Sequence, residues 1–501
     1  MTNGFYWIDY LVLITYLASM VGVGYYFSRK EGSTERFFVG NRTIAWWAVG
    51  ISIFATQLSA ITYISIPGMA YENDWAWLVY NLGAPVVGVL VIYAFLPFYR
   101  RKKYTSIYQV LEERFGPETR AYGALAYILM QVGRIAIVLY LPALALSEVT
   151  GFSVYWMIVV MGVLATLYTV MGGIEVVIWT DVIQGAVLVV GALLALTLIC
   201  LEVDGGLFGI IEIGMENHKF TMVHTDPSVS RDLIWFLLLG AFFTNIVPYA
   251  SDQTVVQRYF TVHTDRQARG SVWLSVLATI PASLLFFFLG TSLFAFYTSH
   301  PGLLESGIAY DRIFPYFIVH QIPMGISGLL IAAIFAGSMS SLDSCLNSIA
   351  TVCITDFYQR FRNPESSDQR RLYLARVITV VTGALGTGLA IGVAHSLLSN
   401  PDQKGAWDLF VAVQGLLGGV LAGIFCVGLF TKRANQIGVT AGLVISTALL
   451  AIIKYEFAWH TQTYAALGIV SAFTVSYVFS LITSRAGQTP STAWNDNSMI
   501  K

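Results

Sequence analysis

The chain has 501 residues, of which 56% are hydrophobic and only 11% are charged, and its formal net charge is −1. Soluble domains carry about 25% charged residues, so this composition excludes a soluble protein and predicts one that crosses a membrane many times. The charge gives no reason to expect a nucleic-acid partner. Four cysteines lie in apolar segments without CxxC spacing, which predicts packing roles: Cys200, Cys345, Cys353 and Cys426.

Long apolar runs predict an all-α polytopic membrane protein with thirteen transmembrane helices, since a helix needs about 20 residues to span a bilayer. No basic region or cleavage site precedes the first run, so we expect it to remain as a span. The polar residues 485–501 are expected to form a disordered tail. The expected spans are 8–28, 45–70, 75–99, 120–148, 153–171, 176–202, 232–261, 270–298, 325–358, 373–398, 405–430, 437–455 and 463–484.

Basic residues gather in alternate loops of this arrangement. They fill residues 29–42 and 100–103, and they recur in 266–269, 360–371 and 432–433, whereas the intervening loops hold few. Loops rich in lysine and arginine stay on the cytoplasmic side. We therefore expect the N-terminus outside and the C-terminus inside, in the cell (inner) membrane, as an odd number of spans requires.

The second and seventh spans are interrupted by polar residues at the depth of the membrane centre. The second carries Thr56, Gln57, Ser59 and Thr62, and the seventh carries Asn245, Pro248, Ser251 and Asp252. Interrupted spans five positions apart are typical of a five-plus-five inverted repeat whose broken helices hold a buried ligand. The alternative for each is a kinked helix without a ligand. The pattern predicts one transporter domain over 1–501, with a leading span, repeats over 45–202 and 232–430, and trailing spans over 437–484.

A polar stripe crosses the apolar segment 325–358. Ser340, Asp343, Ser344 and Asn347 are spaced to lie on one face of a helix. An aspartate at this depth costs about 2.5–3.5 kcal/mol on insertion scales. Hydroxyl, carboxylate and amide oxygens are the ligands that a small hard cation needs in place of water, so the stripe predicts a cation site. Serines that bond to their own helix or pack closely are the alternative, but they leave the aspartate unexplained.

Three charged residues are expected deep in the membrane: Arg134, Asp181 and Asp343. Each needs a partner there. An ion pair between the arginine and one acid is one solution, and it leaves one acid for a cation. A bound cation together with an anionic substrate on Arg134 is the other. Motifs of hydrolases and nucleotide-binding enzymes are missing, which argues against an enzyme, and a channel would explain neither the interrupted spans nor the buried arginine.

Several motifs together resemble the sodium/solute symporter family, which includes sodium–glucose and sodium–proline carriers. They are residues 46–52, 168–184, 255–258 and 340–348, and they spread over nearly the whole chain. The resemblance implies the leucine-transporter fold with one extra leading span. Within the family, residues 54–62, Ser65-Ile-Pro, 133–137 and 172–175 are most similar to those of bacterial sodium-coupled sialic acid symporters, in which the arginine matching Arg134 binds the substrate carboxylate.

The resemblance also implies two sodium sites. The first would use the carbonyls of Ala55, Leu58 and Gly337 with the hydroxyls of Ser340 and Ser341. The second would use Asp181, Ser340, Asp343 and Ser344. Asp343 stands where the sialic acid carriers can have serine, so a proton or a structural contact is an alternative for this carboxylate.

The implied substrate pocket consists of Arg134, Gln57, Ser59, Thr62, Trp77, Asn81, Asn245 and Tyr249. Asn81 and Gln57 differ from residues found in relatives, and the gate tyrosine of the sugar carriers is replaced by Pro248, for which Tyr249 or Phe243 can substitute. Trp77 and Tyr249 have simple packing as an alternative role.

The expected function is sodium-coupled import of an anionic sugar acid, sialic acid (N-acetylneuraminate), by alternating access in a functional monomer. Another carboxylated solute, such as a uronate or a small organic acid, is the alternative substrate. A membrane sensor that binds its ligand without transporting it is the alternative from another functional class.

Overall fold

The structure is a computed structural model that describes residues 6–29, 32–224, 234–305, 307–399, 414–456 and 463–484. The described residues form helices and no β-strand. The predicted tail 485–501, residues 405–413 of a predicted span and residues 225–231 of the predicted outer loop 203–231 lie outside them. In chain order the helices are α1 (Trp7–Ser28), α2 (Thr34–Val39), η1 (Gly40–Arg42), α3 (Trp46–Gln57), α4 (Ala60–Glu72), α5 (Ala76–Asn81), α6 (Gly83–Leu90), η2 (Val91–Phe95), α7 (Leu96–Tyr99), α8 (Tyr108–Phe115), α9 (Pro117–Thr150), α10 (Val154–Glu202), α11 (Gly206–Glu216), α12 (Ile234–Ser251), α13 (Gln253–Tyr259), α14 (Asp265–Ser299), α15 (Tyr310–His320), α16 (Ile326–Val352), η3 (Cys353–Arg362), α17 (Asp368–Ser399), η4 (Gln414–Gly418), α19 (Gly419–Phe430), α20 (Gln436–Glu456) and α21 (Thr463–Thr483).

Nine helices of the described residues are long and apolar enough to cross a membrane, or ten if the bent pair Thr34–Arg42 and Trp46–Gln57 is one span. This confirms a polytopic, all-α membrane protein. The number thirteen stays a prediction, because several predicted spans are divided into shorter helices. The long helices otherwise begin and end close to the predicted residues, with α14 and α17 each starting five residues earlier than expected.

The predicted spans 153–171 and 176–202 lie in one element, α10, that bends between them. Its backbone leaves helical geometry at Gly172 and Gly173, and the φ angle of Gly173 is +54°. A Cβ atom on Gly173 would lie 2.4 Å from the carbonyl oxygen of Phe37. The position therefore requires glycine for its left-handed backbone and for the close approach of α2.

Both interrupted spans are broken helices. The helix α3 ends at Gln57 and α4 begins at Ala60, with a non-helical backbone at Leu58. The helix α12 ends at Ser251 and α13 begins at Gln253, with an extended backbone between them at Asp252. The interruption predicted over residues 245–252 thus falls at its last residue, Asp252, while the helix accommodates Pro248. Such breaks leave backbone groups and helix ends at the centre of the bundle.

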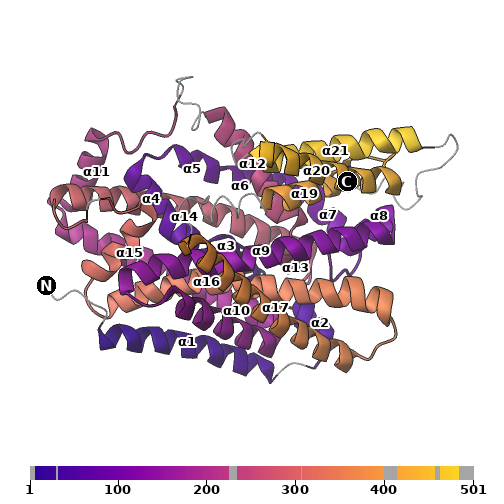
Figure 1. The fold of residues 1–501 in the computed structure, drawn as a ribbon, viewed down its shortest axis with the longest axis horizontal. Helices are drawn as coiled ribbons and strands as arrows, with labels where there is room; N and C mark the ends of the chain where they lie inside the picture. The colour runs from indigo at the N-terminus through magenta and orange to yellow at the C-terminus, as the bar shows by residue number, and fades with distance from the viewer. Residues whose placement is uncertain are drawn as a thin grey trace.

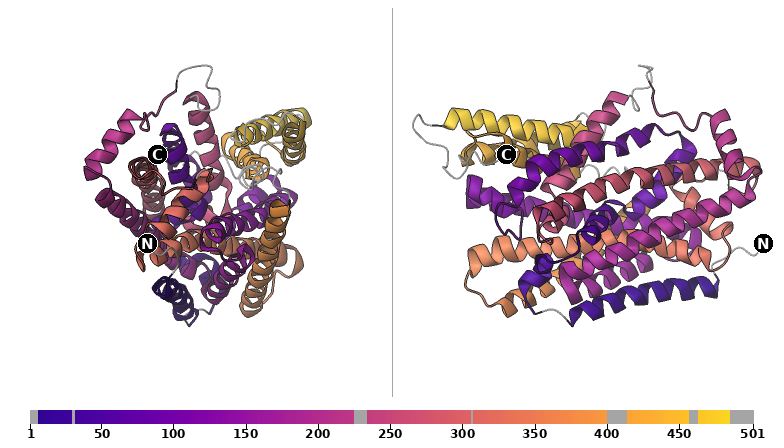
Figure 2. Two further views of the ribbon diagram at one scale, coloured as in Figure 1. Left: turned by 60° about the vertical axis from the view of Figure 1, so that its left-hand side comes forward. Right: turned by 180° about the vertical axis from the view of Figure 1, so that it is seen from behind.

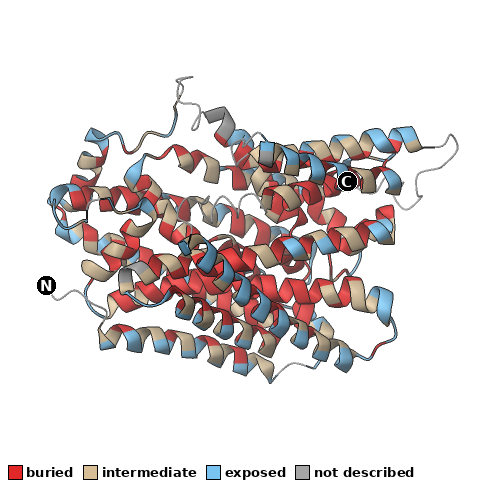
Figure 3. Ribbon diagram, viewed as in Figure 1, coloured by how far each residue is buried: buried red, intermediate tan, exposed pale blue. Residues whose placement is uncertain are grey.

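The helix α16 is the central element of the bundle. Every residue from Leu330 to Val352 is buried, whereas α1 buries only Asp9, Tyr16, Met20 and Gly24. The helices α3, α4, α9 and α10 pack directly against it. Buried residues concentrate around it in Figure 3, while α1 and the pair α20 and α21 lie at opposite edges of the bundle (Figure 1, Figure 2). The polar stripe predicted on α16 is therefore enclosed by protein on all sides.

Four short α-helices lie outside every predicted span: α2, α8, α11 and α15. With 6 to 11 residues each, they are too short to have been distinguished from loops by apolar length.

The segment after α11 fastens the far end of α4. The Lys219 ammonium donates hydrogen bonds to the carbonyls of Tyr71 (2.6 Å) and Asn73 (2.9 Å), where a helix end lacks intrahelical partners. The Trp75 amide donates to the Thr221 carbonyl at 3.0 Å. Burial lowers the pKa of Lys219 below its ordinary value, and nearby acidic side chains oppose this shift. These contacts hold α4 in place beside the site described below.

The leading helix α1 fixes the start of α16 through one buried carboxylate. Asp9 Oδ1 accepts hydrogen bonds from the Gly325 amide (2.7 Å), the Ser327 hydroxyl (2.6 Å) and the Gly328 amide (2.8 Å), while Oδ2 accepts from the Tyr6 amide (2.9 Å). An anionic acceptor at a helix N-terminus satisfies donors that have no partner within the helix and interacts favourably with the helix dipole.

We predict that Asp9→Ala destabilises the protein by about 1–3 kcal/mol, because it leaves buried donors of α16 without an acceptor. Thermal unfolding of the purified protein in detergent measures the change. Asp9→Asn keeps one acceptor oxygen and is the matched control, for which a smaller loss is expected. An unchanged melting temperature for Asp9→Ala would show that the cap is unimportant.

Candidate functional site

The break between α3 and α4 lies directly against α16. A Cβ atom on Gly337 would lie 2.6 Å from the backbone nitrogen of Ala60, so the two backbones touch and only glycine fits this contact without a shift. The Ser59 hydroxyl accepts a hydrogen bond from the Thr62 amide at 3.4 Å and caps α4. The last carbonyls of α3 lack helical partners because the chain leaves the helix at Leu58. The end of α3, where the Gln57 carbonyl accepts from the Ser59 amide at 3.1 Å, therefore faces a helix rich in hydroxyl groups.

The residues predicted for the first sodium site come together at this break. Ala55 and Leu58 lie in the last turn of α3 and just beyond it, and Gly337 lies opposite. The Ser341 hydroxyl is directed to the break and reaches the Thr56 carbonyl at 3.4 Å. The Ser340 hydroxyl instead donates to Asp181 Oδ1 at 2.5 Å, so it joins this group to the second one.

Asp181, on α10, is fully buried and is held by hydroxyl groups and one arginine. It accepts hydrogen bonds from Ser340 and Ser52, both at 2.5 Å. Arg258 Nη2 donates to Asp181 Oδ2 at 2.8 Å and to the Ser344 hydroxyl at 2.7 Å. Asp181 was predicted to bind a cation, but its carboxylate is already paired with the guanidinium group of Arg258.

Asp343 is held by hydroxyl groups and by the Ser344 backbone amide. Its Oδ2 atom accepts from the Tyr168 phenol at 2.9 Å and from Thr180 at 3.4 Å, and the Ser344 hydroxyl donates to Oδ1 at 3.3 Å. Among the described residues no lysine, arginine or histidine forms an ion pair with it. All four residues predicted for the second sodium site thus belong to one buried network with Arg258 at its edge.

The count of three deep charges was wrong, because Asp252 and Arg258 are buried as well. Arg134 Nη1 is 3.3 Å from Asp252 Oδ2, and Arg258 pairs with Asp181. Arg134 therefore forms the ion pair that was the alternative to a bound ligand. Its partner is Asp252, which was not among the charged residues expected at this depth. The sequence analysis included Arg258 only as the last residue of the motif 255–258 and predicted no role for it. The two pairs are neutral, so among these five residues Asp343 is the acid without a basic partner.

A cavity of about 500 Å³ lies between the break of α3 and α4, the helices α5, α9 and α12, and α14. Its wall combines polar and apolar side chains, as ligand pockets do. All eight residues predicted to bind substrate line it: Gln57, Ser59, Thr62, Trp77, Asn81, Arg134, Asn245 and Tyr249. The structure places them together, and their roles stay predictions.

Several polar groups of the cavity wall lack a partner or are weakly held. Gln57 Nε2 and Arg134 Nε are buried donors without a hydrogen bond in the described structure. Asn245 Nδ2 donates to its own helix at the Ala241 carbonyl, 2.8 Å away, so its carbonyl oxygen remains for other donors. Tyr249 shares a 3.3 Å hydrogen bond with Ser275. Unpaired buried donors are costly, which indicates a ligand that supplies acceptors.

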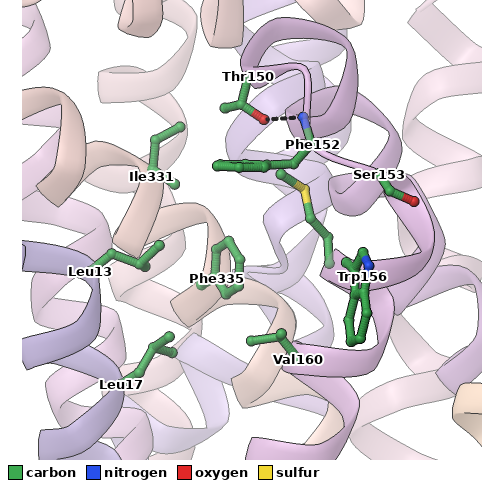
Figure 4. A pocket seen from close by; sticks show the side chains of 10 residues that line it. Leu13, Leu17, Thr150, Phe152, Ser153, Trp156, Val160, Ile331 and Phe335 are labelled. Atoms are coloured by element: carbon green, nitrogen blue, oxygen red, sulfur yellow. Dashed lines mark hydrogen bonds between the residues drawn. The ribbon is translucent and has the colours of Figure 1, made fainter. Parts of the chain in front are cut away.

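A second hollow, of about 250 Å³, has a different character. It lies among α1, the start of α10 and α16, and it is lined almost wholly by apolar side chains, including Leu13, Trp156 and Phe335 (Figure 4). Its polar members, Thr150 and Ser153, carry no charge. This hollow cannot bind a carboxylate, so the cavity at Arg134 is the candidate substrate site.

Residues 37–446 match the model of the sodium:solute symporter family. The chain belongs to this family. It is 36% identical over 472 residues to the sodium/sialic acid symporter NanT of Aliivibrio fischeri, and the aligned region covers 94% of this chain and 92% of that protein. It is 37% identical over 470 residues to the sodium/sialic acid symporter SiaT of Proteus mirabilis, and the aligned region covers 94% of each protein. Both relatives are transporters, and a membrane transporter rather than an enzyme is thereby confirmed.

A solved structure of a Na+-coupled sialic acid symporter, in a substrate-bound outward-open state with a novel Na+ site, superposes with a TM-score of 0.87 at 34% identity, covering 96% of this chain and 99% of that one. The predicted fold class is confirmed: the protein is an all-helical member of the leucine-transporter type. Membership of the family also establishes that transport depends on sodium and that the cargo is a small molecule.

Proposed function

We propose that the protein is a symporter that uses sodium entry to import sialic acid, N-acetylneuraminate, by alternating access. The observation that carries this proposal is Arg134, a buried guanidinium group in the wall of a 500 Å³ cavity that holds unpaired donors. Support also comes from the two sodium/sialic acid symporters that are 36% and 37% identical to the chain. A carboxylate is the ligand that a buried, incompletely paired arginine binds best.

The substrate carboxylate binds Arg134 in this proposal, and the polar residues around the break bind the rest of the molecule. Gln57 supplies an unpaired amide donor, and Asn81 and Asn245 offer side-chain amides to the sugar hydroxyls and the acetamido group. Ser59 and Thr62 add hydroxyl groups at the start of α4.

Trp77 and Tyr249 form the aromatic part of the wall. Trp77 contacts the Tyr80 ring, with centroids 5.7 Å apart, and Tyr249 is almost completely buried, so both also stabilise the cavity by packing. Aromatic faces suit the apolar side of a sugar ring.

The first sodium ion lies at the break of α3, bound by the carbonyls of Ala55, Leu58 and Gly337 and by the hydroxyls of Ser340 and Ser341. Hard oxygen ligands of this kind replace the hydration shell of a small cation. Gln57 and Ser59 of the same break line the substrate cavity. Sodium at the break therefore orders the segment that receives substrate, which couples the two events by differential binding.

A second cation lies between Asp181 and Asp343, with Ser340 and Ser344 as further ligands. Asp343 is the one buried acid of this network without a basic partner, and two carboxylates in low dielectric repel unless a cation lies near both. Arg258 already compensates Asp181, so Asp343 contributes most of the attraction.

The protein is expected to work as a monomer in the cell (inner) membrane, with its N-terminus outside. The loops that carry Arg100 and Arg360 face the cytoplasm in this orientation, as positively charged loops do. Each sodium ion that enters along a potential of about 100 mV contributes about 2.3 kcal/mol to accumulation, so a second ion roughly doubles this electrical contribution.

We predict that the purified protein binds N-acetylneuraminate in a sodium buffer and binds it much more weakly when choline replaces sodium. In the sodium buffer it should also bind the acid far more tightly than an analogue in which a neutral amide replaces the carboxylate. Arg134→Lys keeps the charge but loses the planar fork, so affinity falls by about 2–5 kcal/mol. Isothermal titration calorimetry measures both effects.

Arg134→Ala is the companion variant, and it is expected to distinguish acid from amide hardly at all. If the wild-type protein binds acid and amide equally, Arg134 serves only as the ion-pair partner of Asp252. The sialic acid proposal then fails.

We predict that Ser341→Ala raises the sodium concentration for half-maximal substrate binding about tenfold or more, because the ion loses one of its ligands. A sodium titration at fixed substrate concentration measures this. Ser338→Ala on the same helix is the matched control, since the Ser338 hydroxyl donates to the Val138 carbonyl at 2.8 Å and is directed to α9. An unchanged sodium requirement for Ser341→Ala would place the ion elsewhere.

We predict that Asp343→Asn lowers the Hill coefficient for sodium toward one while substrate binding stays measurable, since the second cation loses its only uncompensated carboxylate. Asp181→Asn is expected to act in the same direction, with an added loss of stability because Arg258 then lacks its buried partner. A flux ratio of one sodium per substrate in the wild-type protein would contradict the second site.

A further inference from the structure

Asp252 is a buried carboxylate at the break between α12 and α13 that lines the same cavity as Arg134. Only 1% of its surface is exposed. Neither the sequence motifs nor the proposed substrate site gave it a function. It stands where a ligand bound to Arg134 would meet it.

The two oxygen atoms of this carboxylate have very different surroundings. Oδ1 accepts three hydrogen bonds, from Gln131 Nε2 at 2.9 Å, from the Thr254 amide at 2.8 Å and from the Thr254 hydroxyl at 2.6 Å. Among the described residues, Oδ2 accepts only from Arg134 Nη1. A carboxylate can accept about four hydrogen bonds in total, so Oδ1 is saturated and Oδ2 has capacity left. The side chain is held rigidly by one oxygen and offers the other.

The contact between Arg134 and Asp252 is incomplete on both sides. Its 3.3 Å length exceeds the range of about 2.7–2.9 Å for hydrogen bonds between charged groups. Arg134 Nε has no partner in the described structure. The cavity thus presents a cation with spare donors beside an anion with a spare acceptor.

We propose that Arg134 and Asp252 together recognise a carboxylic acid whose neighbouring carbon carries a free hydroxyl group. The carboxylate binds the guanidinium group, and the hydroxyl donates its proton to Asp252 Oδ2. The inference rests on the proposed function, and it narrows the substrate class to 2-hydroxy acids, including the free form of a sialic acid, whose second carbon carries both groups.

Other sugar acids do not fit this pair. A uronate has its ring oxygen on the carbon next to the carboxylate, and a sialic acid joined through its second carbon to another sugar has an ether oxygen there. Neither can donate to Asp252, and each directs oxygen lone pairs at a buried carboxylate. The transporter therefore takes the product of a glycoside hydrolase, the free acid, and rejects the intact glycoside.

The test compares three ligands on the intact protein in saturating sodium: N-acetylneuraminate, its 2-deoxy analogue and its 2-O-methyl glycoside. Calorimetry is expected to give affinities about 10- to 100-fold weaker for the two analogues. A loss of this size corresponds to one missing hydrogen bond to a charged group. The 2-deoxy analogue is smaller than the parent acid, so a loss with this compound cannot arise from a steric clash.

Asp252→Asn is the informative variant, because asparagine still caps α13 and its oxygen can still accept from Gln131 and Thr254. Its amide group can no longer accept the ligand proton, so the ratio between the affinities of the parent acid and the 2-deoxy analogue should fall toward one. Asp204→Asn, at an exposed position, is the matched control and should keep the wild-type ratio.

Equal binding of the parent acid and the 2-deoxy analogue by the wild-type protein would overturn the inference while the proposed function stands. Failure of the parent acid itself to bind would overturn the proposed function and the inference with it. A merely structural Asp252 predicts that Asp252→Asn weakens both ligands by the same factor, which also contradicts the inference. If this variant does not fold, the wild-type ligand series alone decides.

Discussion

The structure depends on how buried charge is balanced around α16. Charged groups in a low-dielectric interior are costly unless they are paired, and the structure pairs Asp181 with Arg258 and Asp252 with Arg134. Asp343 remains without a basic partner among the described residues, held by hydroxyl groups and the Ser344 amide. The positions with incomplete partners are thus where a cation and an anionic substrate gain most by binding.

The broken helix explains how two ligands can depend on one another. Residues 55–58 end α3 against α16, and the residues that follow begin α4 and line the cavity at Arg134. Gly337 brings the two backbones into contact, so an ion bound there, as proposed, bears on the same few residues that line this cavity. The fixed ends of this assembly are the Asp9 cap on α16 and the Lys219 contacts on α4.

The sequence was sufficient for the fold class, because long apolar runs interrupted by polar residues are rare enough to stand out. The eight residues that line the cavity at Arg134 came from the resemblance to a known family, not from the polar pattern alone. The breaks at Leu58 and Asp252 were visible in the polar pattern itself. The ionic partners were not, since the pairing of Arg134 with Asp252 and of Arg258 with Asp181 depends on which helices pack together. The short helices were missed because they lack the apolar length that marks a span.

The central claim is that sodium entry drives solute uptake, and transport into proteoliposomes tests it most directly. With an inward sodium gradient and a negative interior potential, labelled N-acetylneuraminate should accumulate above its external concentration. Replacing external sodium with choline should abolish the accumulation, and a more negative potential should increase it because each entering ion carries charge. Binding without accumulation, or equal accumulation without sodium, would contradict the account.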